Sequence, residues 1–188
     1  EDVDRRYLTR FVERPEQLAA FHELMTGPDH LWALHYLGMG GVGKTMLLRH
    51  IGHLAPGDAY HSPVARVDFD YLNPDYPARR PGELLLALAE ELRRHFSAPE
   101  HQRAYVKLRD SLDYLSEIIS GEPPPADPLL NLHRPEFEQA LDLFAALLKS
   151  LLRTAEAARQ PDGPPARVVF VLDTCEELVK SLFSEGAL

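Results

Sequence analysis

Hydrophobic residues recur along the chain at two spacings, one typical of strands and one typical of helices. The runs 31–37 and 167–173 are apolar for most of their length, as buried parallel strands are. The run 64–70 alternates apolar and polar residues and predicts a third strand. Elsewhere apolar residues return every three or four positions, which predicts amphipathic helices at 15–26, 46–54, 81–96, 99–119 and 135–159.

The helical repeats also predict which side chains face the core. The expected core residues are Leu85, Leu88, Leu92, Phe96, Tyr105, Leu108, Leu112, Leu115, Ile119, Phe137, Leu141, Phe144, Leu148 and Leu151. The segment Ser97-Ala98-Pro99-Glu100 has the spacing of a capping box, with Ser97 as the N-cap of a helix. Strands that alternate with helices predict an α/β sandwich with a parallel sheet.

The same order of elements suggests how the chain is divided. Residues 1–30 form an entry segment and a first helix, and residues 31–188 form the core of the domain. A connection at 121–135 contains five prolines and is expected to be extended. Three strands are too few for a complete domain of this kind, so we expect further strands beyond Leu188 in a longer protein.

Composition excludes several classes of partner. The chain has 188 residues and a net charge of −9, from 20 basic and 29 acidic residues, which argues against non-specific nucleic-acid binding. No apolar run approaches membrane-spanning length. Its one cysteine, Cys175, permits no internal disulfide, so a reducing, cytoplasmic location is expected.

A glycine-rich segment between the first strand and the next helix matches the phosphate-loop pattern G-x-x-x-x-G-K-[ST]. Its glycines allow backbone N–H groups to turn inward towards a polyphosphate. Lys44 can reach the β- and γ-phosphates, and the Thr45 hydroxyl can hold Mg²⁺. The residues expected to bind nucleotide are Gly38, Met39, Gly40, Gly41, Val42, Gly43, Lys44, Thr45 and Met46.

A second motif supports a nucleotide site. The apolar run 167–173 ends at Asp173, as a buried strand that delivers a Mg²⁺-organising carboxylate does. Right-handed crossovers would bring Asp173 and the glycine-rich segment to one edge of the sheet. Alone, Asp173 would be read as the N-cap of a following helix. Glu176 or Glu177 could polarise an attacking water.

These motifs together resemble the STAND class of P-loop ATPases, which includes the NACHT and apoptotic/resistance-type signalling ATPases. The segment 11–14, Phe-Val-Glu-Arg, resembles the Phe-Val-Gly-Arg entry motif of that class, with Glu13 in place of glycine. The segment 173–177, Asp-Thr-Cys-Glu-Glu, resembles the NACHT-type acidic motif. The resemblance implies a three-layer, AAA+/STAND-like fold that binds ATP or ADP with Mg²⁺. It also implies that Val12 and Arg14 lie beside the nucleotide, that Asp173 serves Mg²⁺, and that Glu176 activates water.

The function implied is an ATP/ADP-controlled switch in a multidomain signalling protein that hydrolyses ATP slowly. The class carries sensor and effector domains in the same chain, and self-association on activation is expected. Lys44, Asp173 and Glu176 would carry the chemistry, although this part of the protein is expected to turn over little. A motor-like remodelling ATPase and a non-hydrolysing nucleotide-binding scaffold remain as alternatives.

Overall fold

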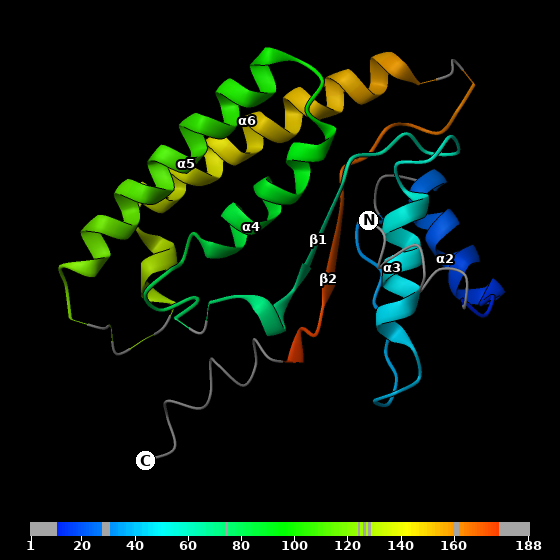
Figure 1. Ribbon diagram of the computed structural model, residues 1–188, viewed down its shortest axis with the longest axis horizontal. Coiled ribbons are helices and arrows are strands. Elements are labelled where there is room, and N and C mark those ends of the chain that lie inside the picture. Colours follow the sequence, from blue (N-terminus) through cyan, green and yellow to red (C-terminus); the bar gives the residue numbers. More distant parts are fainter. Residues whose placement is uncertain are drawn as a thin grey trace.

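The fold is a two-stranded parallel sheet with helices on both faces (Figure 1). A computed structural model describes residues 11–27, 31–73, 75–123, 125, 127, 129–159 and 162–176. Strand β1, Val64–Asp68, pairs along its whole length with β2, Val169–Asp173. The register joins Val64 to Val169 and Asp68 to Asp173. Both strands therefore end at the same edge of the sheet, with Asp68 beside Asp173.

Two helices, α2 (Pro15–Thr26) and α3 (Lys44–Leu54), cover one face of the sheet (Figure 1). Pro15 stands at the start of α2, where a missing N–H costs nothing. This layer has its own core, made of Phe21, Met25, Leu47, Ile51, Ala55, Tyr60, Val64 and Val171. The core fixes α3 against the strands, with the start of α3 near their carboxyl ends.

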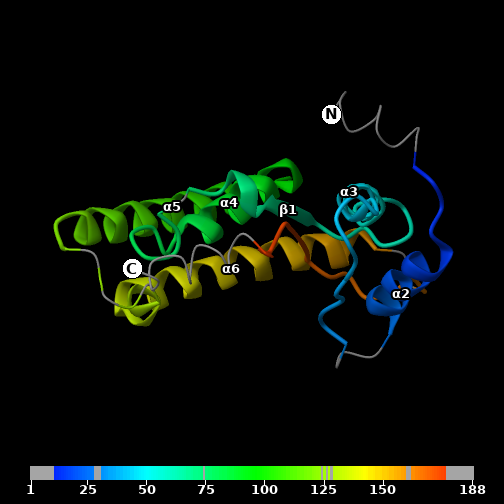
Figure 2. The ribbon, with the colours of Figure 1, turned by 90° about the horizontal axis from the view of Figure 1, so that it is seen from below.

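A larger helical layer covers the other face. Its elements, with the short 3-10 turns, are η1 (Phe69–Tyr71), α4 (Glu83–Leu92), η2 (Arg93–His95), α5 (Pro99–Ser120), η3 (Leu130–His133) and α6 (Pro135–Ala158). Helix α6 returns alongside α5, and the pair extends beyond the sheet (Figure 2). Ala65 and Val67 of β1 belong to the core beneath these helices. No helix in the described residues combines the length and apolar character needed to cross a bilayer.

The predicted helices are confirmed, with small differences at their ends and on one face. The core positions expected of α5 are all buried. In α6, Leu141 is 41% exposed and Leu148 is half-buried, whereas Ala140 and Leu147, each one position earlier, are buried. Both sets satisfy a 3.6-residue repeat that includes Phe144. The position of α5, which the repeat alone does not specify, decides between them.

The strand predicted at 31–37 is not formed. Leu34 and Tyr36 pack against the core of the α2–α3 layer, whereas Trp32 is 85% and Leu37 is 93% exposed. The segment is apolar like a buried strand, but no described strand pairs with it. Strand formation requires hydrogen bonds to a neighbour, and an apolar run alone does not supply them. The structure therefore has an α/β arrangement with two parallel strands in its described residues.

The capping box predicted at Ser97 is also wrong. Helix α5 begins after Ala98, and no side chain caps its first turn. The Ser97 backbone N–H instead donates to Nδ1 of His101, at 3.2 Å. His101 is fully buried, and its Nε2 lies 3.1 Å from Thr154 Oγ1 on α6. A buried imidazole thus joins α5 to α6 at the place where a hydroxyl cap was expected.

Candidate functional site

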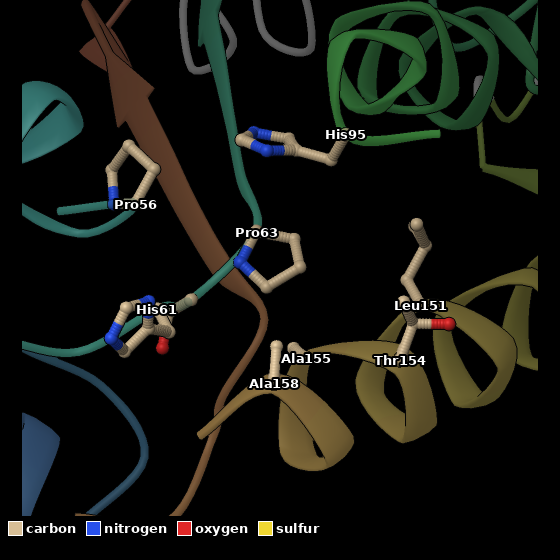
Figure 3. Close-up of a pocket in the computed structure, with 9 residues that line it drawn as sticks. Pro56, His61, Pro63, His95, Leu151, Thr154, Ala155 and Ala158 are labelled. Atoms are coloured by element: carbon tan, nitrogen blue, oxygen red, sulfur yellow. The ribbon is translucent and has the colours of Figure 1, made fainter. Parts of the chain in front are cut away.

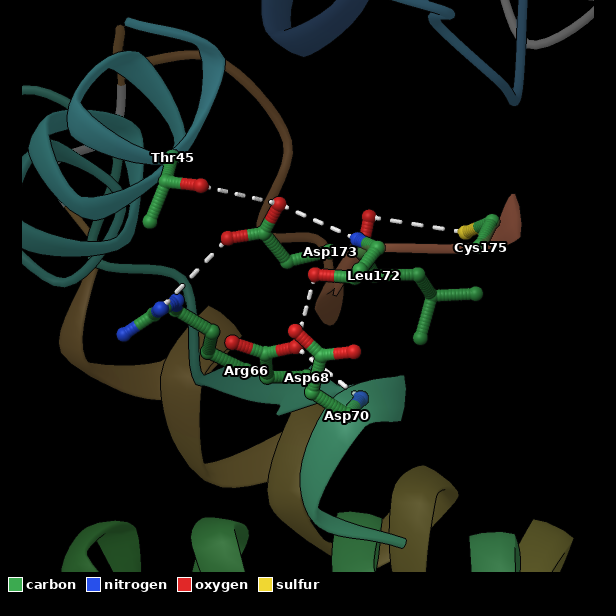
Figure 4. Close-up of polar contacts among 8 residues, drawn as sticks. Thr45, Arg66, Asp68, Asp70, Leu172, Asp173 and Cys175 are labelled. Carbon is green, nitrogen blue, oxygen red and sulfur yellow. Dashed lines mark hydrogen bonds and ion pairs between the residues drawn. The ribbon is translucent and has the colours of Figure 1, made fainter. Parts of the chain in front are cut away.

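The candidate site lies at the carboxyl edge of the sheet, where α3 begins. The Thr45 hydroxyl donates to Asp173 Oδ1 at 3.3 Å, although the two residues are 128 positions apart (Figure 4). The backbone N–H of Thr174 donates to the same oxygen at 3.1 Å. The fold thus brings together the two residues that the sequence predicts as Mg²⁺ ligands.

The glycine-rich segment that precedes α3 turns sharply into the helix. Gly41 has a φ of 80° and Gly43 a φ of 85°, in the left-handed region that favours glycine. A side-chain atom added at Gly43 would also lie 2.9 Å from Nη2 of Arg14. Lys44 Nζ donates to the carbonyl oxygens of Gly38, at 2.7 Å, and Met39, at 3.3 Å. The lysine therefore holds its own loop in a closed turn.

The first turn of α3 is open to an anion. No side chain caps this end of the helix, and the first turn contains no acidic residue. The first N–H groups of a helix lack intrahelical acceptors, and the helix dipole favours negative charge there. Five residues of the preceding loop are exposed, namely Gly38, Met39, Gly40, Gly41 and Val42. Met46, the remaining predicted contact, is half-buried on α3.

The entry segment lies beside this loop. The Arg14 guanidinium donates to the Val42 carbonyl oxygen. Phe11 stacks on His50 of α3, with ring centroids 4.1 Å apart and planes inclined by 12°. Val12 is exposed between these two contacts. Arg14 therefore reaches the glycine-rich loop, whereas Val12 faces away from packed structure.

Asp173 is buried next to a cation from the neighbouring strand. Arg66 Nη2 of β1 lies 3.5 Å from Asp173 Oδ2, and the two side chains are 20% and 6% exposed respectively. Sequence reasoning did not identify Arg66 as part of the site. The available signal was a charged residue between Ala65 and Val67 in an otherwise buried strand, because buried charges are normally paired.

A second acid, Asp68, lies beside Asp173 at the end of β1. Its Oδ1 accepts hydrogen bonds from the Thr174 hydroxyl, at 2.7 Å, and from the Asp70 backbone N–H, at 3.2 Å. Thr174 has a φ of 57°, a strained value for a β-branched residue. Asp68 therefore caps η1 and holds the turn that follows Asp173.

Of the two acids predicted to activate water, the structure describes one. Glu176 is exposed and makes no hydrogen bond or ion pair with another described residue. Glu177 lies outside the described residues. Cys175 lies between Asp173 and Glu176 in the sequence. The pKa of its thiol is raised by partial burial and then by the charges of Glu176 and Asp173. This thiol is therefore poorly suited to act as a nucleophile.

One cavity in the described residues lies away from this edge. Pro63 and Ser62, just before β1, line a cavity of about 180 Å³ with His95 and the last turns of α6 (Figure 3). Ligand pockets usually measure roughly 300–1,000 Å³, so this cavity is too small for a nucleotide. No group of three or more His, Cys, Asp or Glu side chains in the described residues is arranged to bind a metal. The carboxyl edge, where Thr45 meets Asp173, is the candidate site.

Comparison with known proteins adds no relative. No protein-family model matches the chain, and no match is found among the curated proteins or the solved structures.

Proposed function

We propose that this chain is the ATP/ADP-binding switch domain of a larger multidomain signalling ATPase. The observation that carries the proposal is the contact between Thr45 and Asp173. It joins the start of the helix after a glycine-rich loop to the end of a parallel strand. In open α/β sheets, ligands bind beyond the carboxyl ends of the strands, which is where this contact lies.

The phosphates would bind at the loop and the first turn of α3. The open helix start offers backbone N–H donors, and the left-handed Gly41 and Gly43 allow the loop to curve around an anion. Lys44 now donates to two loop carbonyls, so its ammonium already lies over the loop. A γ-phosphate oxygen would replace these carbonyls as the acceptor, because an ammonium binds an anionic oxygen more strongly than a neutral carbonyl.

The residues at this edge also fit Mg²⁺. Mg²⁺ prefers hard oxygen ligands, and a hydroxyl and a carboxylate oxygen lie 3.3 Å apart here. Asp173 Oδ1 accepts from the Thr45 hydroxyl and Oδ2 is paired with Arg66, so a bound ion would share this carboxylate with Arg66. Thr45 and Asp173 would hold the ion, which would neutralise charge on the β- and γ-phosphates.

Arg14 would set the shape of the loop on the nucleotide side. Its bond to the Val42 carbonyl ties the entry segment to the phosphate-binding turn. The stacked pair of Phe11 and His50 holds the same segment against α3. Val12, which is exposed beside them, would contact the nucleotide only if the entry segment closes over it.

The chemistry assigned to the chain is slow, Mg²⁺-dependent hydrolysis in the intact protein. Glu176 would orient the attacking water, and its exposed side chain is able to move towards the edge that Asp173 marks. The choice of a switch over a motor, the adenine base, the sensor and effector domains and self-association rest on the resemblance of the three motifs to the STAND class. A cytoplasmic location is part of the same proposal.

Calorimetric titration with ATP and ADP, with Mg²⁺ or EDTA present, tests nucleotide binding. We expect Lys44→Ala to weaken binding roughly 10- to 150-fold, because a charge-assisted contact contributes about 1.5–3 kcal/mol. Lys107→Ala, at an exposed position on α5, is the matched control and should bind like wild type. Equal affinity of wild type and Lys44→Ala would overturn the proposal. Competition with GTP in the same titration tests the preference for adenine.

A further inference from the structure

The Asp173 carboxylate divides its two oxygens between different partners. Oδ1 accepts from the Thr45 hydroxyl and from the Thr174 N–H (Figure 4). Oδ2 is buried, accepts no hydrogen bond, and faces Arg66 at 3.5 Å. Only Oδ1 is therefore fixed by hydrogen bonds, and the environment of Oδ2 is set by a charge.

Arg66 is held by its ion pair with Asp173. Its Nε is buried without a hydrogen-bond partner. The Asp68 carboxylate, beside Asp173 at the end of β1, accepts from Thr174 and from the Asp70 N–H. Arg66 forms its ion pair with Asp173. An ionised carboxylate that is 6% exposed is costly without a partner, so the arginine stabilises a charge that the fold has buried.

We propose that Arg66 is the positioning residue and built-in counter-charge of Asp173. It pairs with Oδ2 and thereby keeps Oδ1 directed at Thr45 before any divalent ion binds. The assignment of Mg²⁺ to this edge rests on the proposed function, whereas the pairing of Arg66 with Asp173 does not. Arg66 and Mg²⁺ would share the Asp173 carboxylate, and two consequences follow. Arg66 stabilises the metal-free protein, and it lowers the affinity of the edge for Mg²⁺.

Thermal unfolding in EDTA, without nucleotide, tests the first consequence. Arg66→Met keeps most of the side-chain volume but removes the charge, and we expect its melting temperature to fall by at least about 5 °C. Arg66→Lys keeps the charge and should recover most of this loss. Arg103→Met, at an exposed position on α5, removes one arginine from the surface and should melt like wild type.

A double-variant cycle with Asp173→Asn separates charge pairing from packing. If Arg66 neutralises Asp173, the double variant should lose less stability than the sum of the two single variants. Additive losses would overturn the proposal. If Arg66→Met alone fails to fold, the double variant decides the question: recovered folding supports the pairing, and continued failure overturns it.

Titration of Mg²⁺ at saturating ATP tests the second consequence. We expect Arg66→Met to need about fivefold less Mg²⁺ than wild type, the lower end of typical coupling between two binding events. Arg66→Lys should need nearly the wild-type concentration. An unchanged or higher Mg²⁺ requirement in Arg66→Met would overturn the counter-charge role. If wild type binds no nucleotide, the proposed function fails, and the stability cycle alone then decides for or against Arg66.

Discussion

Thr45 and Asp173 meet across the carboxyl edge of the sheet, with the hydroxyl donating to the carboxylate at 3.3 Å. Thr45 lies in the first turn of α3, and Asp173 is the last residue of β2. The contact depends on the core of the α2–α3 layer, which includes Leu47 of α3 and Val171 of β2. Two residues from opposite ends of the chain are thus held in one place by packing behind them.

This geometry predicts that Asp173→Asn separates metal-dependent from metal-independent binding. The amide keeps the shape of the side chain but lacks the charge that Mg²⁺ requires. We expect ATP affinity in Mg²⁺ to fall about tenfold or more, while affinity in EDTA changes little, since the loop and Lys44 remain intact. Calorimetry under both conditions measures the split.

Asp113→Asn, at an exposed position on α5, is the matched control for that experiment. It should bind ATP like wild type with and without Mg²⁺. An equal loss for Asp173→Asn in Mg²⁺ and in EDTA would mean that the carboxylate supports the fold of the edge and does not serve the metal.

A second prediction concerns the acid that orients water. Glu176 follows Asp173 by three positions and is exposed, so its replacement should not disturb the fold. We expect Glu176→Gln in the intact protein to keep ATP binding and to lower steady-state turnover about 100-fold or more, within the usual range for a general base. Glu177→Gln should turn over normally.

The reverse result would move the role to Glu177. If neither substitution lowers turnover, the acid comes from elsewhere or the protein binds nucleotide without hydrolysing it. ATP binding measured on the same samples distinguishes lost catalysis from lost binding.

A third prediction concerns Arg14 and the shape of the loop. Removing its bond to the Val42 carbonyl should free the turn that precedes Lys44. We expect Arg14→Ala to weaken ATP binding about fivefold, which corresponds to roughly 1 kcal/mol for one hydrogen bond. Arg153→Ala, at an exposed position on α6, is the control and should leave binding unchanged. Wild-type affinity in Arg14→Ala would show that the entry segment is remote from nucleotide binding.

Features with a local cause were predictable from the sequence. Pro15 and Gly27 bracket α2, because proline suits the first turn of a helix and glycine commonly follows the last. The strand that ends at Asp173 was predictable from a run of apolar residues followed by an acidic one. The meeting of Asp173 with Thr45 was expected from parallel crossovers, but the strand at 31–37 that this rule needs is not formed, and packing of α3 against β2 brings the two residues together.

Features that depend on a partner in space were not predictable. The segment 31–37 is apolar like a buried strand, but no described strand pairs with it. Arg66 became part of the site only when the register of β1 and β2 put it next to Asp173. Ser97 was read as a helix cap from spacing alone, whereas its N–H donates to a histidine that also contacts α6. In each case the missing information was the identity of a neighbour in space.

The last prediction concerns pH and the joint between β1 and η2. The pKa of His95 is lowered, first by burial and then by the charge of Arg94. Its Nε2 lies 3.1 Å from both the backbone nitrogen and the carbonyl oxygen of Val64, so the ring is held at the start of β1. Because the folded pKa lies below the unfolded value of about 6.5, the unfolded chain binds the proton more readily. The stabilising contribution of neutral His95 is therefore complete above pH 6.5 and is lost as the pH falls below it.

We expect the free energy of unfolding, measured by urea titration, to fall between pH 7 and pH 5.5. His95→Gln keeps an acceptor for the Val64 N–H but does not titrate, so this variant should show a shallower fall. His50, whose pKa is also lowered by burial, should leave part of the slope in place. His133→Gln, at an exposed position in η3, is the control and should follow wild type. A slope in His95→Gln as steep as that of wild type would exclude His95 as a source of the pH dependence.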